Sequence, residues 1–411
     1  MRITNDGSMV YCRWSNKFNG TVNIRDVDPR DFFQQHMAPL RQALLQGHKL
    51  PGCNDCYQME QHNKVSGRQR QLLKTGVRLQ QFEKTMQSSP WAQHWLKNYH
   101  TGVTDQMPQD WQIDLGNYCN SACVFCSPRD SSQLAAEWKK IGLISQMPPP
   151  NWTNNPAVVR KFVDVLLQSQ HVQYIHFIGG ETVITPAFKV ILKALIAAGL
   201  HHSATIGFTT NLTVWDQEVA DLLCKFSGVN LGMSVETFDS VNDYVRWPSQ
   251  IAQVINIRDR WVQLGQQQNW LMQLRVTPTI LTISHLLSVY KYASQQNISV
   301  ESCNFLQNPE YLRPSVLPLD ARQHCVDQLQ EWLVGVAASE TLVINTRDPG
   351  HAQQQISQDL QSYVNYLKHE PDESFRLPEA VAFLKTLEAS RNNSVLDYLP
   401  EYEQLFRSAG Y

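Results

Sequence analysis

Three cysteines, Cys119, Cys123 and Cys126, are spaced as Cys-x3-Cys-x2-Cys and are the residues of this chain best suited to chemistry. Three thiolates held close together can ligate three irons of a four-iron cluster and leave the fourth iron without a protein ligand. An open coordination position is where a metal centre performs catalysis. A structural zinc site would need a fourth Cys or His, and none follows Cys126 within the next dozen residues. The spacing alone leaves a catalytic cluster, a structural metal and unrelated thiols open.

A second motif, Gly179-Gly180-Glu181, follows the cysteines by one predicted β-α-β step. Residues 111–116 and 171–178 are predicted to be strands, and the glycine pair comes directly after the second of them. Glycines let the backbone approach a ligand closely, and a carboxylate can accept a hydrogen bond from an ammonium group. Taken alone, the motif equally fits a tight turn from a strand into a helix.

The elements around these motifs alternate between strand and helix patterns. Helices are predicted at residues 188–196, 214–226 and 283–295, and further strands at 203–210, 229–236, 271–280 and 298–306. The alternation predicts parallel β-α units, hence an α/β fold in which six units form a partial, TIM-like barrel. Chemistry in such barrels sits at the C-terminal ends of the strands, where both motifs, Asn211, Glu236 and Cys303 are expected.

The cysteine loop followed by Gly-Gly-Glu resembles the radical S-adenosylmethionine (SAM) superfamily, over roughly residues 111–306. The resemblance implies a partial (β/α)6 barrel, a SAM-binding 4Fe-4S cluster and catalytic cysteines at the three loop positions. It also implies a set of cofactor contacts: Phe125 against the adenine, Gly179, Gly180 and Glu181 at the methionine amino group, and Asn211, Ser234 and Glu236 at the strand ends, the last two near the ribose.

A second cysteine group lies near the N-terminus, where Cys53 and Cys56 form a Cys-x2-Cys pair and Cys12 lies upstream. This segment resembles the twitch domain, a shorter relative of the SPASM domain. The resemblance implies an auxiliary iron–sulfur cluster on these three cysteines. Twitch domains usually follow the barrel, whereas this segment precedes it, as in a rarer N-terminal group. The fourth ligand is therefore open, and so is the alternative of a zinc knuckle or a structural Cys-x2-Cys turn.

The three remaining cysteines carry weaker expectations. Cys224 and Cys325 lie in predicted helices and are expected to be buried small hydrophobic residues. Cys303 would lie at the end of the last barrel strand. Donation of a hydrogen atom to a substrate radical, ligation of the auxiliary cluster and plain packing all remain open for it.

Composition narrows the class of protein. With 42% hydrophobic and 18% charged residues the chain can bury a large core, and a net charge of −2 argues against a broad nucleic-acid or membrane surface. No apolar run is long enough to span a membrane, and the first residues carry no export pattern. The nine cysteines are therefore predicted to be reduced thiols, several of them for metal, in a cytoplasmic protein.

Polar and proline-rich stretches predict the domain boundaries. Residues 101–110 and 308–318 are such stretches, and they divide the chain into a twitch-like domain (1–107), the barrel (108–310) and a helical C-terminal extension (311–411). Prolines at 148–150 indicate that residues 130–155 make a long excursion near the cysteine loop.

The family resemblance implies the reaction. The reduced cluster would pass one electron to SAM, which splits into methionine and a 5′-deoxyadenosyl radical that abstracts hydrogen from the substrate. An external reductant of the flavodoxin or ferredoxin type would supply the electron. A peptide or protein substrate is the favoured interpretation, and a small metabolite, sugar or nucleotide is the alternative. An iron–sulfur electron carrier or scaffold remains the non-enzyme hypothesis; it does not explain why the cysteine loop and Gly-Gly-Glu occur together.

Overall fold

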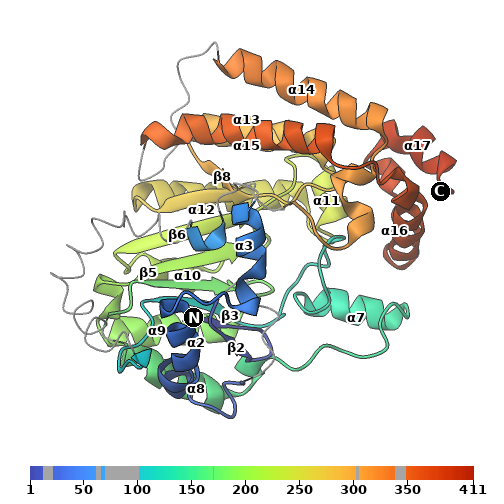
Figure 1. Cartoon of the computed structure of the whole chain (residues 1–411). Helices are drawn as coiled ribbons and strands as arrows, with labels where there is room; N and C mark the ends of the chain where they lie inside the picture. The colour runs from blue at the N-terminus through green and yellow to red at the C-terminus, as the bar shows by residue number, and fades with distance from the viewer. Residues whose placement is uncertain (13–21, 62–65, 70–100, 170, 302–304, 338–348) are drawn as a thin grey trace.

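The computed structural model describes residues 1–12, 22–61, 66–69, 101–169, 171–301, 305–337 and 349–411. Its centre is an eight-stranded sheet of order β2-β1-β3-β4-β5-β6-β7-β8 (Figure 1). The strands are β1 (Arg2–Ile3), β2 (Met9–Val10), β3 (Asp110–Asp114), β4 (Tyr174–Ile178), β5 (Thr205–Thr210), β6 (Gly228–Ser234), β7 (Leu271–Arg275) and β8 (Ser299–Glu301).

Every neighbouring pair from β3 to β8 is parallel, which confirms the predicted α/β class. The chain also adds strands that the sequence did not predict. β1 pairs in parallel with β3, and β2 pairs with β1 in the antiparallel direction. The first ten residues thus extend the same sheet as residues 110–301, although the predicted division places them in a separate N-terminal part. That division, at residue 107, stays a prediction.

Helices surround the sheet and continue beyond it (Figure 1). In the part of the chain that the structure describes, the α-helices are α1 (Pro29–Asp31), α2 (Ala38–Leu45), α3 (Asn54–Gln61), α7 (Ser132–Lys140), α8 (Pro156–Leu167), α9 (Pro186–Ala197), α10 (Gln217–Leu223), α11 (Val241–Val245), α12 (Ile251–Gln267), α13 (Leu286–Gln296), α14 (Leu319–Ala337), α15 (Pro349–His369), α16 (Leu377–Arg391) and α17 (Glu403–Ser408).

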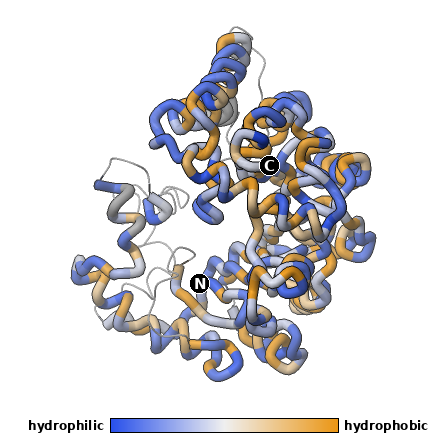
Figure 2. Tube along the Cα trace, turned by 90° about the vertical axis from the view of Figure 1, so that its right-hand side faces the viewer, coloured by the Kyte–Doolittle hydropathy of each residue, from blue (hydrophilic) through white to orange (hydrophobic). Residues whose placement is uncertain are grey.

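One face of the sheet is apolar and packs on the helices. Successive side chains of a strand point to opposite faces, and in β4 every second residue is fully buried. The ring of Phe177 in β4 lies 5.0 Å from that of Phe188 in α9, and Phe208 in β5 lies 5.6 Å from Trp261 in α12. The helices carry hydrophobic and hydrophilic residues in alternation along the chain, as expected for elements with one buried side (Figure 2).

The opposite face of the sheet, called the inner face below, is polar. Its half-buried positions, aligned by the strand register, include Tyr174, His176, Thr209, Asn230, Gln273 and Arg275. Closed barrels fill this space with bulky branched residues. Here glycines make room for long polar side chains, since a Cβ at Gly232 would lie 2.6 Å from Nε of Arg275. The inner face is therefore suited to polar contacts with a ligand rather than to a dry core.

Several predicted elements are too long. The strand predicted over 271–280 ends at Arg275, because the amides of Thr277 and Ile280 bond elsewhere, to Glu236 and Leu312. The helix predicted from residue 214 begins at Gln217, because Asp216 caps it and accepts from the amide of Val219. The strand predicted over 298–306 is described at residues 299–301, and Cys303 lies outside the described residues.

The helices after residue 318 form two groups. α14 and α15 lie against each other, whereas α16 and α17 lie at the end of the molecule that also carries α7 (Figure 1). The edge-to-face contact of Trp138 and Phe383, with ring centres 5.8 Å apart, joins α7 to α16. Cys325, in α14, is buried as predicted, and Cys224, which follows α10, is half-buried.

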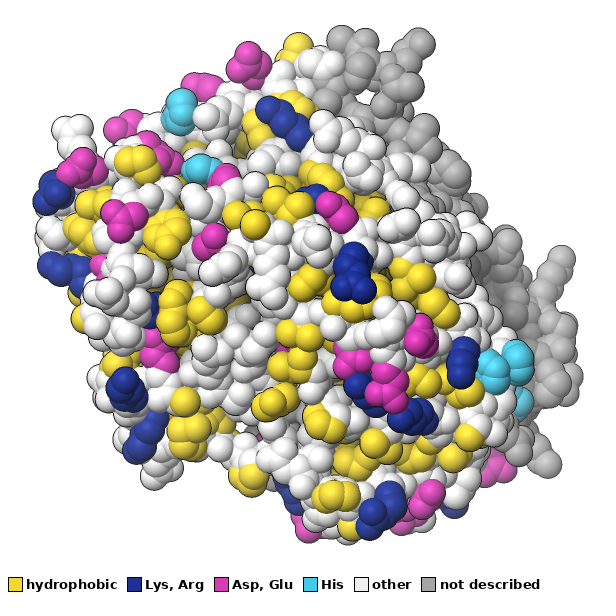
Figure 3. Space-filling model, turned by 180° about the vertical axis from the view of Figure 1, so that it is seen from behind, with side chains coloured by type: hydrophobic (Ala, Val, Ile, Leu, Met, Phe, Trp, Pro, Cys, Tyr) yellow, Lys and Arg dark blue, Asp and Glu magenta, His cyan; other side chains and the backbone are white. Residues whose placement is uncertain are grey.

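Side chains of different kinds are mixed on one face of the molecule. Lys and Arg side chains lie among Asp, Glu and hydrophobic side chains on the face drawn in Figure 3. A search of the described helices for a stretch of membrane-spanning length and apolarity found none.

A histidine between two carboxylates links the C-terminal residues to the barrel. Nδ1 of His285 lies 2.7 Å from Asp239, and Nε2 lies 3.2 Å from Glu401. The hydrogen bond to Asp239 raises the pKa of His285 above its ordinary value of 6.5; burial acts against this rise, and Glu401 adds to it. The charged form is therefore favoured by folding, and its stabilisation is lost as pH rises through the folded pKa.

We expect His285→Gln to remove this pH-dependent contribution. Urea unfolding at about pH 6 and about pH 8.5 should show that the stability difference between wild type and variant shrinks at the higher pH. The exposed His171→Gln is the matched control and should show no such change. An equal loss of stability at both pH values would mean that the charge of His285 contributes nothing.

Candidate active site

The cysteine loop follows β3 and gathers its three thiols inside the protein. Burial raises the pKa of Cys119 to about 12, and the neighbouring Cys123 adds to the rise. Burial likewise raises the pKa of Cys126, with Cys123 and Cys119 among the further causes. Each thiol is thus within electrostatic reach of the others. A metal that binds here has to displace their protons.

Main-chain hydrogen bonds hold this loop from two sides. The amides of Ala122 and Val124 donate to the carbonyls of Trp247 and Val245, at 2.7 and 2.8 Å. From the excursion at 130–155, Ser131 donates to the carbonyl of Ser121 at 2.5 Å. The excursion therefore lies against the loop, as predicted, and its helix α7 follows directly from these contacts.

The Gly-Gly-Glu turn packs directly against the start of the cysteine loop. The amide of Gly180 donates to the carbonyl of Gly116 at 2.7 Å, and the amide of Glu181 donates to that of Tyr118 at 2.8 Å. A Cβ at Gly180 would lie 2.4 Å from the carbonyl oxygen of Tyr118. Glycine is required here because the two loops touch through their backbones.

Glu181 lies at the centre of a buried network. Its two carboxylate oxygens accept from the amides of Val183 and Asn211, at 3.0 and 2.5 Å. Burial raises the pKa of Glu181 to about 7, although these bonds act against the rise. The side chain of Asn211 in turn donates to Asn120 at 2.9 Å and lies 4.0 Å from Sγ of Cys119. Glu181 and Asn211 thus join the glycine turn to the cysteine loop, as their predicted places at strand ends suggested.

Glu236 is paired with an arginine that sequence analysis did not single out. One oxygen of Glu236 accepts from Nη2 of Arg246 at 2.6 Å, and the other accepts from the amide of Thr277 at 2.7 Å. The Glu236 side chain is 1% exposed and that of Arg246 is 11% exposed. The Arg246 guanidinium also lies 5.7 Å from the ring centre of Phe125. Ser234, two residues before Glu236, ends β6 and is half-buried.

Arg246 brings a positive charge to the cysteines. Burial lowers the pKa of its guanidinium, but Glu236, Cys123 and Cys126 outweigh this effect and raise it. The structure therefore brings together, at one end of the sheet, the described residues that were predicted there, while Cys303 lies outside the described residues. These residues are Cys119, Cys123, Phe125, Cys126, Gly179, Gly180, Glu181, Asn211, Ser234 and Glu236. Arg246 directly follows α11, and no pattern in the sequence singled it out.

The donor set fits a cluster better than a single ion. The three loop cysteines are free thiols, and Arg246 can balance part of the charge of a metal–thiolate group. Within the described ranges, no three His, Cys, Asp or Glu side chains converge on a point suited to one metal ion. The thiolates that hold a four-iron cluster can lie farther apart than the ligands of a single ion, because each thiolate binds a different iron.

The N-terminal cysteines lie around a tyrosine. Oη of Tyr11 is 3.6 Å from Sγ of Cys53. Burial raises the pKa of Tyr11, and Cys53 and Cys12 add to the rise, so both cysteines lie near this hydroxyl. Cys56 is buried one turn later, in α3. The structure thus places Cys12 and Cys53 near the same hydroxyl, and ligation of a second cluster by Cys12, Cys53 and Cys56 stays a prediction.

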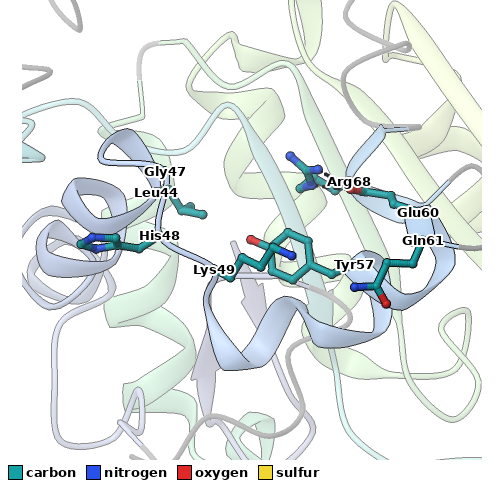
Figure 4. Close-up of a pocket in the computed structure, with 8 residues that line it drawn as sticks. All are labelled: Leu44, Gly47, His48, Lys49, Tyr57, Glu60, Gln61 and Arg68. Atoms are coloured by element: carbon teal, nitrogen blue, oxygen red, sulfur yellow. Dashed lines mark hydrogen bonds and ion pairs between the residues drawn. The ribbon is translucent and has the colours of Figure 1, made fainter.

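A hollow of about 440 Å³ is lined by residues of α2, α3 and the segment between them, together with Arg68 (Figure 4). The Lys49 ammonium and the Arg68 guanidinium each lie 5.4 Å from the ring centre of Tyr57. Arg68 is paired with Glu60 in α3. None of the loop cysteines lines this hollow, so we do not assign the reaction to it.

Comparison with known proteins agrees with this geometry. Residues 113–272 match the family model described as the radical SAM superfamily, a span that runs from β3 into β7 and contains the cysteine loop and the glycine turn. No curated protein matches the chain at a significant level.

Solved structures show distant likeness. Streptococcus suis SuiB bound to its precursor peptide SuiA is 15% identical, with a TM-score of 0.40, over 64% of this chain and 54% of SuiB. The protein anSMEcpe with bound AdoMet is 16% identical, with a TM-score of 0.40, over 58% of this chain and 64% of its own. The methyltransferase TsrM of Kitasatospora setae is 14% identical, with a TM-score of 0.33, over 44% and 34%. The chain thus spans about half the length of SuiB.

Proposed function

We propose that this chain is a radical SAM enzyme acting on a peptide or protein, since residues 113–272 match the model of the radical SAM superfamily, whose members depend on SAM. The observation that carries the proposal is the gathering of three free thiols, one buried and two half-buried, with Glu181 and Arg246 at the C-terminal ends of parallel strands. When bound, the cluster supplies the electron that splits SAM into methionine and a hydrogen-abstracting 5′-deoxyadenosyl radical.

In this proposal the chain's own residues bind and orient. Cys119, Cys123 and Cys126 hold the cluster, and Phe125 lies against the adenine. Gly179, Gly180 and Glu181 receive the ammonium group, beside the backbone amides that donate to the two Glu181 oxygens. Asn211 joins Glu181 to the cysteine loop. Ser234 and Glu236 contact the ribose, with Glu236 held by Arg246.

The polar inner face of the sheet supports a peptide as substrate. A peptide main chain presents a donor and an acceptor at nearly every residue, and side chains such as Asn230 and Gln273 can serve both. A small metabolite, sugar or nucleotide is the second candidate, since it too could use these groups. An auxiliary iron–sulfur cluster on Cys12, Cys53 and Cys56 and an external one-electron reductant complete the proposal.

Anaerobic reconstitution with iron and sulfide tests this function. Wild type should bind about eight irons per chain and form 5′-deoxyadenosine with SAM and dithionite. About four irons with product would keep the enzyme and remove the auxiliary cluster. Absence of both product and SAM binding would contradict the proposal and leave an electron carrier or scaffold. A Cys224→Ala variant is the matched control, because this half-buried cysteine lies outside both groups.

A further inference from the structure

The last residue of α16 reaches the cysteine loop from almost the other end of the chain. Nη2 of Arg391 donates to the carbonyl oxygen of Ala122 at 2.8 Å, across a sequence separation of 269 residues. Ala122 directly precedes Cys123. The Arg391 side chain is 1% exposed, so this contact lies inside the protein, beside the residues proposed to hold the cluster.

Arg391 is itself fixed in one orientation. Its Nε and Nη2 donate to the two carboxylate oxygens of Glu137 in α7, at 2.9 and 2.7 Å. Such a paired arrangement of donors and acceptors fixes direction as well as distance. The guanidinium carbon also lies 5.0 Å from the ring centre of Trp247. Arg391 therefore cannot turn away from Ala122 without losing these contacts.

The carboxylate partner is held in its charged form. Burial opposes ionisation of Glu137, but hydrogen bonds from Arg391 and Ser390 outweigh it and hold its pKa below the ordinary value of 4.5. Ser390 donates to Glu137 at 2.6 Å. At neutral pH, Glu137 and Arg391 thus form a charged pair with several hydrogen bonds, which is costly to break when it is buried.

Other contacts hold α16 in place independently of Arg391. Glu388, one turn earlier, accepts from the hydroxyl of Tyr244 at 3.0 Å and from that of Tyr411 at 2.9 Å. It also accepts from the amide of Val395 at 2.5 Å. The helix is therefore a firm support, and loss of the Arg391 side chain should act on the cysteine loop rather than release the helix.

The peptide units at Ala122 are held from both sides. Its carbonyl accepts from Arg391, and its amide donates to the carbonyl of Trp247 at 2.7 Å. Arg391 thus holds the loop at the residue that directly precedes Cys123, and its guanidinium charge lies beside that peptide unit.

We propose that Arg391 is a positioning residue of the cluster site, which clamps the cysteine loop at Ala122 and places a positive charge beside Cys123. The C-terminal helix α16 then completes the site that the barrel begins. The role of the loop as a cluster site rests on the proposed function. The contact of Arg391 with Ala122 does not require a cluster, so it can be tested in the metal-free protein.

Hydrogen exchange on the metal-free protein tests the clamp directly. In Arg391→Met the amides of Ala122 and Val124 should exchange at least about tenfold faster, whereas the amides of Tyr174–Ile178 in β4 should be unchanged. Arg407→Met is the matched control, because Arg407 lies in the same C-terminal region and is paired with the exposed Glu403. Unchanged exchange at Ala122 in Arg391→Met would overturn the proposal.

Loss of iron to a chelator from the reconstituted protein is the second measurement. Arg391→Met should release iron about five- to tenfold faster than wild type, and Arg391→Lys, which keeps the charge, should fall between them. If wild type takes up no iron, the proposed function fails, but hydrogen exchange at Ala122 still tests whether Arg391 clamps the loop. If wild type holds iron and Arg391→Met matches it in both measurements, the positioning role fails.

A second variant covers the case in which Arg391→Met does not fold. Glu137→Gln keeps the donor of the Ala122 bond and removes the charged partner that orients it. We expect a smaller increase in exchange at Ala122, in the same direction. Exchange equal to that of wild type in a folded Glu137→Gln would show that the orientation of Arg391 does not matter, and would overturn the clamp.

Discussion

Cys126→Ala is expected to abolish SAM cleavage, lowering formation of 5′-deoxyadenosine by more than about 1,000-fold, or about 4 kcal/mol of lost catalysis. Cys126 is one of three thiols gathered in the cysteine loop, and a cluster left with two protein ligands lacks the support it needs. Iron content should fall by about four per chain, since one whole cluster would be lost. Iron analysis and quantification of 5′-deoxyadenosine by chromatography check both expectations.

The control for this loss is the same substitution at a cysteine outside the loop. Cys224→Ala removes a half-buried thiol far from the loop in sequence and should keep iron content and product formation. Urea unfolding of both metal-free variants should differ little from wild type, because removal of one sulfur costs little packing. Full SAM cleavage by Cys126→Ala would refute the assignment of the cluster to this loop.

Arg246→Met is expected to cost about 3–5 kcal/mol of stability in the metal-free protein, because it leaves a buried carboxylate without its partner. Glu236 is 1% exposed, and its oxygen accepts from Arg246 at 2.6 Å. Burial already raises the pKa of Glu236, against the influence of Arg246, so removal of the arginine should favour its protonated form further. Urea unfolding of the metal-free chain measures this cost without interference from a cluster.

The double variant Glu236→Gln/Arg246→Met separates the buried charge from the packing. It should recover about half or more of the lost stability, because the uncompensated charge is gone. The exposed control Arg407→Met should change stability by less than about 0.5 kcal/mol. If Arg246→Met were no more destabilising than this control, the buried pair would not be what holds this part of the site.

The local patterns of the sequence were sufficient for the α/β class and for the candidate site. The strands at 174–178 and 228–234 and the helix at 186–197 follow from apolar spacing, which depends only on neighbours along the chain. The residues at strand ends then had to meet, because parallel strands present their C-terminal ends at one edge of a sheet. The cysteine loop, Glu181 and Asn211 do meet there.

The sequence was less informative about ends and partners. Element ends depend on where a backbone amide finds its acceptor, as Thr277 does at Glu236, and the acceptor lies far away in the chain. The same limit hid β1, because two residues gain a strand only from the neighbour they pair with. The predicted roles of Cys12, Cys53 and Cys56 likewise depend on a contact between segments that are distant in the sequence.

By itself, the sequence determined the chemistry of the site: three thiols at cluster spacing, a glycine turn that tolerates close backbone contact and an α/β frame to carry them. Only the tertiary structure decided what surrounds that chemistry. Arg246 comes to the cysteines and Phe125 across a gap of more than a hundred residues, and Arg391 comes from α16. A single charged residue has no pattern along the chain, because its partner is set by packing rather than by spacing.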